Sequence, residues 1–134
     1  MANLRFSPAV SREKSGIGFL QLIELLEGEE VVGHARWMCW GEIGQGVAQI
    51  LELVVTPAQG RKGHGRILMN AVTEQAREYF KLRKVALRRI WMAIAQEGQV
   101  IGRSFLMKFG FHHVGTVHEL LADEDLLVYM RTFN

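Results

Sequence analysis

The segment 59–66 combines glycines and basic residues in a pattern suited to binding an anion. Its glycines leave the backbone open to a close ligand and its cations add positive charge: Gly60, Gly63 and Gly65, with Arg61, Lys62 and Arg66. The apolar run before it predicts a strand, and the spacing of apolar residues after it predicts a helix. At such a junction the free N–H groups and the positive end of the helix dipole bind phosphate oxygens. We therefore predict a diphosphate site, with a plain strand-to-helix turn as the alternative.

The loop differs from two common nucleotide-binding loops. It lacks the Gly-Lys-Ser/Thr ending that holds the phosphates of a nucleoside triphosphate. The strands before it are predicted to be antiparallel, whereas a dinucleotide site opens a βαβ unit. Neither a nucleoside triphosphatase nor a dinucleotide-dependent dehydrogenase fits this pattern.

Other reactive side chains carry weaker signals. Cys39 would need an adjacent base to act as a nucleophile, but strand alternation places His34 on the opposite face, which favours a buried structural thiol. The histidines at 112, 113 and 118 lack carboxylate or cysteine partners at ligand spacing. We therefore predict no metal site and expect these histidines on a partly exposed strand.

The elements that position the loop follow from the period of the apolar residues. Strand patterns at 17–26, 31–40 and 47–56 are joined by short turns that contain glycine, which predicts an antiparallel meander. After the loop, apolar residues recur at helical spacing to about Leu82. The remaining predicted elements are a strand at 85–95, a shorter helix at 99–109, strands at 112–121 and 126–133, and at most one short strand, near 4–6, at the N-terminus.

Two motifs in this order resemble the GNAT family of N-acetyltransferases. In that family a strand ends in a Val-x-Pro step, and a Gln/Arg-x-x-Gly-x-Gly/Ala loop opens a helix. The matching residues are Val55-Thr56-Pro57, then Gly63-His64-Gly65 and Arg66-Ile67-Leu68. Downstream, the run 104–111 ends in Phe-Gly-Phe and is similar to the second-helix signature of the family. The resemblance covers roughly residues 46–111.

The resemblance implies an α/β (α+β) fold. A mixed, mainly antiparallel central sheet of about six to seven strands would carry the helices, in a single domain that spans residues 1–134. Family members commonly place two helices between their first and second strands, but Ser7–Gly18 has room for little more than a loop. We therefore expect these N-terminal helices to be reduced or absent. In family members these helices form one wall of the site that binds the amine acceptor. We therefore hypothesise that a second subunit of a homodimer completes this wall, or that the acceptor is large.

The resemblance also implies acetyl-CoA, or a related acyl-CoA, as the cofactor. The diphosphate would lie on the loop N–H groups, with His64 exposed, and the pantetheine arm would pair with the end of the preceding strand. A bulge in that strand would free N–H groups near Val54 to polarise the thioester carbonyl. The implied cofactor-binding residues are Leu53, Val54, Val55, Gly60, Arg61, Lys62, Gly63, His64, Gly65, Arg66, Gln99, Gly102 and Leu106.

The chain departs from the family at the positions that handle protons. Where several members carry a glutamate base the residue is Gln49, and where many carry a tyrosine acid it is Leu106. Glu52 is the nearest carboxylate, on the opposite strand face from Gln49 unless a bulge resets the alternation. Glu52 is therefore the candidate catalytic base, with a structural role as the alternative, and Tyr129 is a substitute acid.

The resemblance thus implies an acetyl-CoA-dependent N-acyltransferase. A primary amine, on a small molecule or a protein, would attack the thioester directly in a ternary complex. The alternative is a non-catalytic acyl-CoA-binding or interaction module on the same fold, which the residues at positions 49 and 106 favour. A tryptophan bordering the acceptor pocket would favour an apolar or aromatic amine, and the basic residues at 81–89 would bind nucleic acid or the 3′-phosphate of CoA, or be solvated.

Composition limits the other classes. The 134 residues, 49% of them hydrophobic, suffice for one domain with a core, and a net charge of +2 gives no reason to expect nucleic-acid or membrane partners. The single cysteine precludes an intramolecular disulfide, which favours a reducing compartment. No signal-like segment and no uncharged stretch of the ~18 residues needed to cross a bilayer is present. We therefore predict a cytoplasmic protein.

Overall fold

The computed structural model of the chain describes residues 4–6, 10–11, 20–56, 63–95, 102–121 and 124–133. The predicted order of meander, helix, strand, helix and hairpin is confirmed within these residues. The elements are β1 (Leu4–Phe6), β2 (Val10–Ser11), β3 (Leu20–Glu27), β4 (Glu30–Cys39), the 3-10 turn η1 (Ile43–Gln45), β5 (Val47–Val55), α1 (His64–Lys81), β6 (Arg89–Ala95), α2 (Arg103–Lys108), β7 (His112–Leu121) and β8 (Glu124–Thr132).

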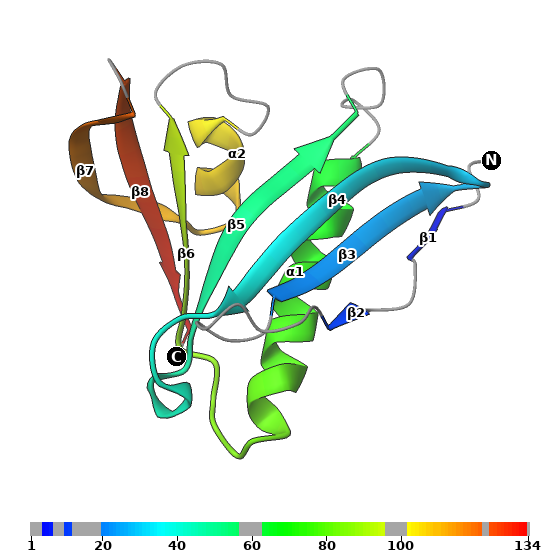
Figure 1. Ribbon diagram of the computed structural model, residues 1–134, viewed down its shortest axis with the longest axis horizontal. Coiled ribbons are helices and arrows are strands. Elements are labelled where there is room, and N and C mark those ends of the chain that lie inside the picture. The colour runs from blue at the N-terminus through cyan, green and yellow to red at the C-terminus, as the bar shows by residue number, and fades with distance from the viewer. Residues whose placement is uncertain are drawn as a thin grey trace.

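The strands form one twisted sheet in the order β1-β3-β4-β5-β6-β8-β7, with the two-residue β2 also paired to β3 (Figure 1). All neighbours are antiparallel except β5 and β6, which are parallel because α1 connects them. The predicted mixed, mainly antiparallel sheet is therefore confirmed, with the very short β2 as an addition. No α-helix precedes β3 in the described residues, as expected for reduced N-terminal helices.

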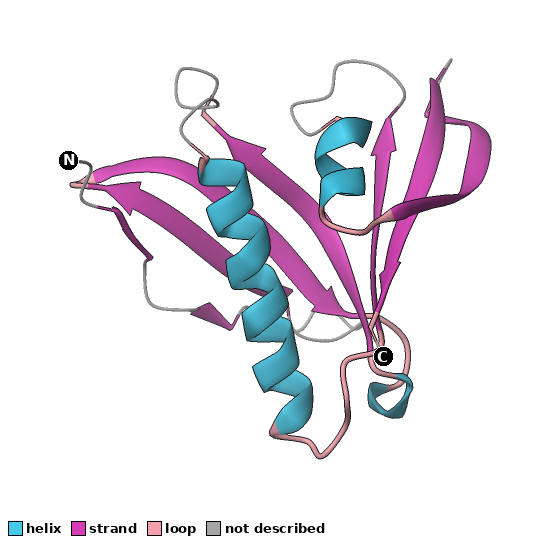
Figure 2. Ribbon diagram, turned by 180° about the vertical axis from the view of Figure 1, so that it is seen from behind, coloured by secondary structure: helices cyan, strands magenta, loops and turns pink. Residues whose placement is uncertain are grey.

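Both α-helices cover the same face of the sheet (Figure 2). The apolar stripe of α1 packs on β3, β4 and β5, where Leu68, Val72 and Phe80 are fully buried. On the strands, alternate side chains point into this helix side of the sheet, so each strand has one core-facing row. In the described residues no helix covers the other face, which we call the helix-free face.

Strand β6 begins later than its composition predicts. The sequence pattern indicates a strand from Val85, but the ladder with β5 starts at Arg89, opposite Val47. The reason is a backbone anchor at Gly46, whose carbonyl accepts hydrogen bonds from both Arg88 N–H (2.8 Å) and Arg89 N–H (3.2 Å). The chain is thereby held in a turn until it can join the sheet. The second helix is also shorter than predicted, and residues 96–101 lie outside the described part of the chain.

Gly46 permits this anchor in two ways. Its φ of +67° lies in the left-handed region that side chains disfavour, and a Cβ there would come within 2.3 Å of the Ala86 carbonyl oxygen. The approach of the β4–β5 connection to the start of β6 therefore requires glycine at this position.

We predict that Gly46→Ala destabilises the protein by about 2 kcal/mol, because it adds backbone strain and a contact with backbone that cannot move aside. Urea unfolding measures the effect. Gly44→Ala is the matched control, since nothing lies within 4 Å of a Cβ at Gly44 and its φ is not positive. Equal stability of the two variants would contradict the anchor.

Candidate functional site

A bulge in β5 decides which side chains face the site. Arg36 of β4 lies opposite Glu52, but the next β4 residue lies opposite Ile50, so Leu51 is an extra residue without a partner. The core-facing residues are Ala48 and Ile50 before the bulge, and Leu53 and Val55 after it. The alternation is therefore reset at Leu51.

The reset brings Gln49 and Glu52 to the same, helix-free face. Without a bulge, strand alternation would have placed Glu52 on the face opposite Gln49. The bulge that the sequence analysis required for Glu52 to share the face of Gln49 is therefore present. Glu52 thus lies on the same side of the sheet as the residue at the position of the expected base.

Beyond the bulge, β5 and β6 separate. Their ladder extends only from Val47 opposite Arg89 to Ile50 opposite Met92, although both strands continue, and the divergence is plain in Figure 1. Thr56 N–H donates to the Val32 carbonyl (3.0 Å), which fixes the direction of the alternating amides of β5.

We call the gap between the diverging ends of β5 and β6 the splay. By this alternation, the N–H groups of Leu53 and Val55 point toward the splay, and the N–H group of Val54 points toward β4. The predicted free N–H groups near Val54 are therefore those of its two neighbours. Within the described part of the chain these two N–H groups have no ladder partner, so they could pair with a ligand that lies along this edge of β5.

The N-terminus of α1 lies at the end of β5. Gly63 is its N-cap with φ +78° and offers no side-chain cap, and the first turn contains no acidic residue. The N–H groups of the first turn, at residues 64–66, have no partner within the helix. A Cβ on Gly65 would lie 3.2 Å from the Phe105 ring and 3.8 Å from Val55, so glycine lets α1, α2 and β5 converge here. The predicted loop-to-helix junction is present, and an anion would meet free amides there.

The structure describes some, and not all, of the predicted cofactor-binding residues. Gly60, Arg61, Lys62 and Gln99 lie outside the described residues. Arg66 is exposed on the first turn of α1, and Gly102 is the N-cap of α2, where its carbonyl accepts a hydrogen bond from Leu106 N–H (3.2 Å).

The expected exposure of His64 is wrong. Its side chain is only 1% exposed because the first residue of α1 faces the sheet, where Nε2 lies 3.9 Å from Glu27 Oε2. His64 Nδ1 and Glu27 Oε2 are buried without a hydrogen-bond partner. His64 therefore presents its backbone N–H, and not its imidazole, to the junction.

Two other candidate residues are buried. Leu106 has no exposed surface and belongs to the core. Tyr129, the proposed substitute acid, is 3% exposed and lies on the core side of β8, opposite Met92, with its ring near that of His113. Tyr129 and Glu52 thus lie on opposite faces of the sheet.

Glu52 is held by two neighbours on β4. His34 Nε2 donates to Glu52 Oε1 at 3.0 Å, and Arg36 Nε lies 3.1 Å from the same oxygen. We call these three residues the carboxylate clasp. Neither contact uses Oε2, so one carboxylate oxygen is anchored and the other is available. The sequence pattern shows that His34 and Arg36 share a face but gives no sign of their partner, because cross-strand register depends on the bulge.

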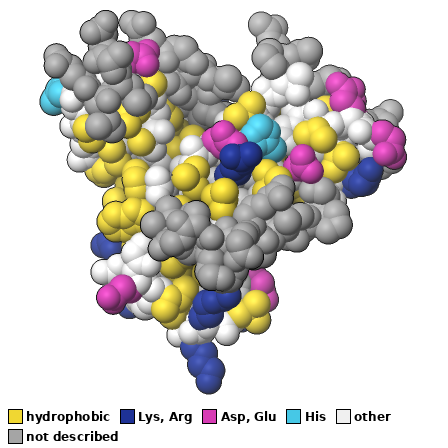
Figure 3. Space-filling model, viewed as in Figure 1, with side chains coloured by type: hydrophobic (Ala, Val, Ile, Leu, Met, Phe, Trp, Pro, Cys, Tyr) yellow, Lys and Arg dark blue, Asp and Glu magenta, His cyan; other side chains and the backbone are white. Residues whose placement is uncertain are grey.

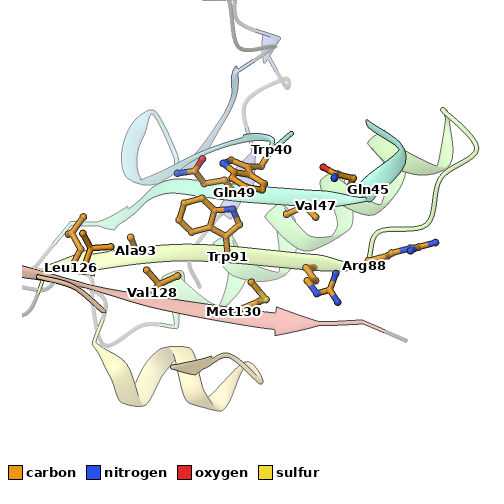
Figure 4. A pocket seen from close by; sticks show the side chains of 12 residues that line it. Trp40, Gln45, Val47, Gln49, Arg88, Trp91, Ala93, Leu126, Val128 and Met130 are labelled. Carbon is orange, nitrogen blue, oxygen red and sulfur yellow. The ribbon is translucent and has the colours of Figure 1, made fainter. Parts of the chain in front are cut away.

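A groove of about 850 Å³ lies on the helix-free face beside the clasp. Figure 3 shows hydrophobic side chains gathered on this face near a group of histidine, acidic and basic side chains. In Figure 4, Trp40 and Trp91 project into the groove from the end of β4 and from β6, with Gln49 next to them. The lining residues are Trp40, Gln45, Val47, Gln49, Arg88, Arg89, Trp91, Ala93, Val117, Leu126, Val128 and Met130.

The three tryptophans have different roles. Trp37 is fully buried and donates from Nε1 to Gln75 Oε1 (2.6 Å). Trp40 is 48% exposed, and its ring meets that of Trp91 edge-on with centroids 5.8 Å apart. Trp40 and Trp91 therefore line the groove. The sequence hypothesis of an apolar or aromatic amine depends on such a tryptophan.

Basic residues 81–89 do not form one patch. Arg83 lies over the Tyr79 ring (3.7 Å to its centroid) and donates to the Tyr79 carbonyl, whereas Arg88 and Arg89 line one end of the groove. The sequence alone gave no basis for separating these arginines.

Cys39 and the histidines of β7 lie apart from this chemistry. Burial raises the pKa of the Cys39 thiol, which the positive charge of Arg83 partly offsets, so the thiol form dominates at neutral pH. His112 and His113 are exposed, and His118 Nδ1 donates to Asp125 (3.1 Å). Among the described residues, no group of three potential ligands could hold a metal ion. No described helix is long and apolar enough to span a bilayer.

Comparison with known proteins adds an independent result. A sequence model of the acetyltransferase (GNAT) family matches residues 5–111. No curated protein matches the chain.

Solved structures share the fold at low identity. The IAA acetyltransferase from Bacillus cereus is 11% identical with a TM-score of 0.76, over 98% of this chain and 100% of that one. An acetyltransferase from Bacillus subtilis in complex with CoA is 13% identical with a TM-score of 0.72, over 98% and 100%. An N-acetyltransferase from Staphylococcus aureus is 19% identical with a TM-score of 0.67, over 84% and 67%.

We predict that inorganic diphosphate stabilises the protein against thermal unfolding, because the uncapped first turn of α1 offers free N–H groups to an anion. Gly63→Asp should abolish the stabilisation, since it places a negative charge beside those donors, where it repels a second anion. Gly110→Asp is the control: Gly110 also has positive φ (+83°) and room for a side chain, but it follows α2. An equal diphosphate shift in Gly63→Asp and the wild type would exclude this junction as the anion site.

Proposed function

The chain belongs to the acetyltransferase (GNAT) family, and from this premise we propose that it transfers an acetyl group from acetyl-CoA to a primary amine. The observation that carries the proposal is the bulge at Leu51. This one extra residue turns Glu52 toward the helix-free face at the place where β5 leaves β6 and its amides lose their partners. A carbonyl-polarising edge and a carboxylate are thereby combined at one site.

Two parts of the described chain support this cofactor. The free amides of the first turn of α1 suit a diphosphate, and the unpaired edge of β5 suits an amide-containing arm that adds to it as a strand would. Gly60, Arg61 and Lys62, and the Gln99 and Gly102 region, are proposed to complete this surface, with Leu106 supporting it from the core. Bound there, acetyl-CoA supplies an activated acyl group on a thioester.

The proposed chemistry is a direct transfer. The N–H groups of Leu53 and Val55 stabilise negative charge on the carbonyl oxygen as the amine nitrogen attacks the carbonyl carbon. The new C–N bond would form as the C–S bond breaks, and CoA would leave as a thiolate that takes up one proton from solvent water. The amine loses a proton to Glu52 Oε2, directly or through water.

The carboxylate clasp prepares Glu52 for this role. Because His34 and Arg36 both contact Oε1, the side chain is held in one orientation with Oε2 free. Fixing the base removes a rotational freedom that would otherwise be lost in the transition state.

The second candidate is a non-catalytic acyl-CoA-binding module on the same fold. Gln49 cannot take a proton and Leu106 cannot donate one, so the two usual positions for proton transfer are empty of titratable groups. Both candidates require the cofactor surface. They differ only in whether Glu52 makes up for the missing groups.

Two measurements test the proposal in order. Thermal unfolding with CoA and with acetyl-CoA examines binding, and the absence of any stabilisation at millimolar ligand would refute both candidates. Release of CoA thiol from acetyl-CoA in the presence of a panel of primary amines then separates the enzyme from the binding module.

We predict that Glu52→Gln lowers kcat about 100-fold or more, because a positioned general base contributes at least that factor, and leaves stabilisation by CoA unchanged. Steady-state thiol release measures kcat. Glu24→Gln is the matched control, since Glu24 lies opposite His34 on the same sheet face, one strand farther from the splay. If Glu52→Gln and Glu24→Gln turn over equally fast, Glu52 has a structural role only.

A further inference from the structure

The groove on the helix-free face has two chemically different ends. At one end it reaches Gln49 and Ala93, which flank the last ladder pair before β5 and β6 separate. At the other end it reaches Arg88 and Arg89. The groove therefore joins the splay to a pair of positive charges.

The middle of the groove is apolar. Trp40 and Trp91 form one wall, and Val128 and Met130 of β8 form part of the floor (Figure 4). Along β6, Ala93 and Arg89 are four residues apart, which corresponds to about 13 Å in an extended strand. An aromatic ring with a short chain on either side fits this length.

The two arginines are fixed in place by their backbone. Arg88 N–H and Arg89 N–H both donate to the Gly46 carbonyl, and the Arg88 carbonyl accepts a hydrogen bond from Phe133 N–H (2.7 Å). Both side chains are exposed, and neither forms an ion pair within the part of the chain that the structure describes. Two unpaired guanidinium groups beside an apolar groove are complementary to a carboxylate or another small anion.

We propose that the groove selects an acceptor amine that carries an aromatic body and an anionic group at the end remote from the amine. The inference rests on the proposed function, since the splay must be the place of transfer. The amine then points toward Glu52 at the splay, the ring lies against Trp40 and Trp91, and the anion meets Arg88 and Arg89. The order of these three features along the groove sets the order of groups in the substrate.

Three commercial amines test each feature separately. Para-(aminoethyl)benzoate has the amine, ring and carboxylate, phenylethylamine lacks the carboxylate, and aminohexanoate lacks the ring. We expect kcat/KM for para-(aminoethyl)benzoate to exceed that for each of the others by about tenfold, because phenylethylamine loses one charged contact and aminohexanoate loses the apolar contact of the ring. Raised salt should reduce the advantage over phenylethylamine, because it screens exposed charges.

Variants identify the residues. In Arg88→Gln/Arg89→Gln, kcat/KM for para-(aminoethyl)benzoate should fall about tenfold, to the level of phenylethylamine, so that the preference between these two amines disappears. Lys84→Gln/Lys108→Gln removes the same charge from exposed positions that do not line the groove and should keep the preference. Trp91→Leu should weaken both aromatic amines equally.

A binding measurement keeps this inference separate from the proposed function. Trp40 and Trp91 lie in the groove, so quenching of tryptophan fluorescence by each amine, in the presence of CoA, reports binding without turnover. The same tenfold order of Kd values is expected even if no transfer occurs, in which case only the enzymatic proposal fails. Equal Kd values for the three amines, or no quenching by any of them, overturn the inference and leave the transferase proposal standing on its own test.

A second copy of the chain is the competing occupant. Sedimentation would then show a dimer that Trp91→Leu dissociates and that para-(aminoethyl)benzoate does not affect. That result would also overturn the inference.

Discussion

The site depends on a single unpaired residue in a central strand. Leu51 has no partner on β4. This one extra residue shifts the register with β4 and exchanges the sheet faces to which the later side chains of β5 point. The core-facing row continues with Leu53 and Val55, Glu52 turns to the other face, and the ladder to β6 ends one residue before the bulge. The bulge itself lies on the β4 side of β5, and the edge left without a ladder partner in the described residues lies on the β6 side.

The rest of the fold keeps that edge open and directed. Helix α1 connects the only parallel pair of the described sheet, so its N-terminus lies beside the end of β5 and its positive end faces the splay. On the far side, the Gly46 carbonyl holds the start of β6 close to β5. The two strands are therefore fixed together at one end and free at the other. The wedge between them therefore follows from the bulge in β5 together with this topology.

The sequence predicted the parts of this arrangement that depend on local pattern. The helical period after Gly63 and the alternation in β4 and β5 are local, so the order of elements and the loop-to-helix junction could be predicted. Register is not local, because it depends on which residue of a neighbouring strand lies opposite. For this reason the face of Glu52 could be stated only conditionally, and its contacts with His34 and Arg36 could not be predicted. His64 was misplaced because a loop motif does not show where the helix begins, and the first helical residue here faces the sheet.

Neighbouring residues of β6 face different surroundings, the core on one side of the sheet and the groove on the other. Ile90, Met92 and Ile94 pack into the core, while Trp91 and Ala93 face the groove. A substitution at a groove position therefore leaves core packing intact, and one at a core position leaves the groove lining unchanged. One set of alternate positions on β6 can therefore change the lining of the groove while the other set keeps the core residues in place.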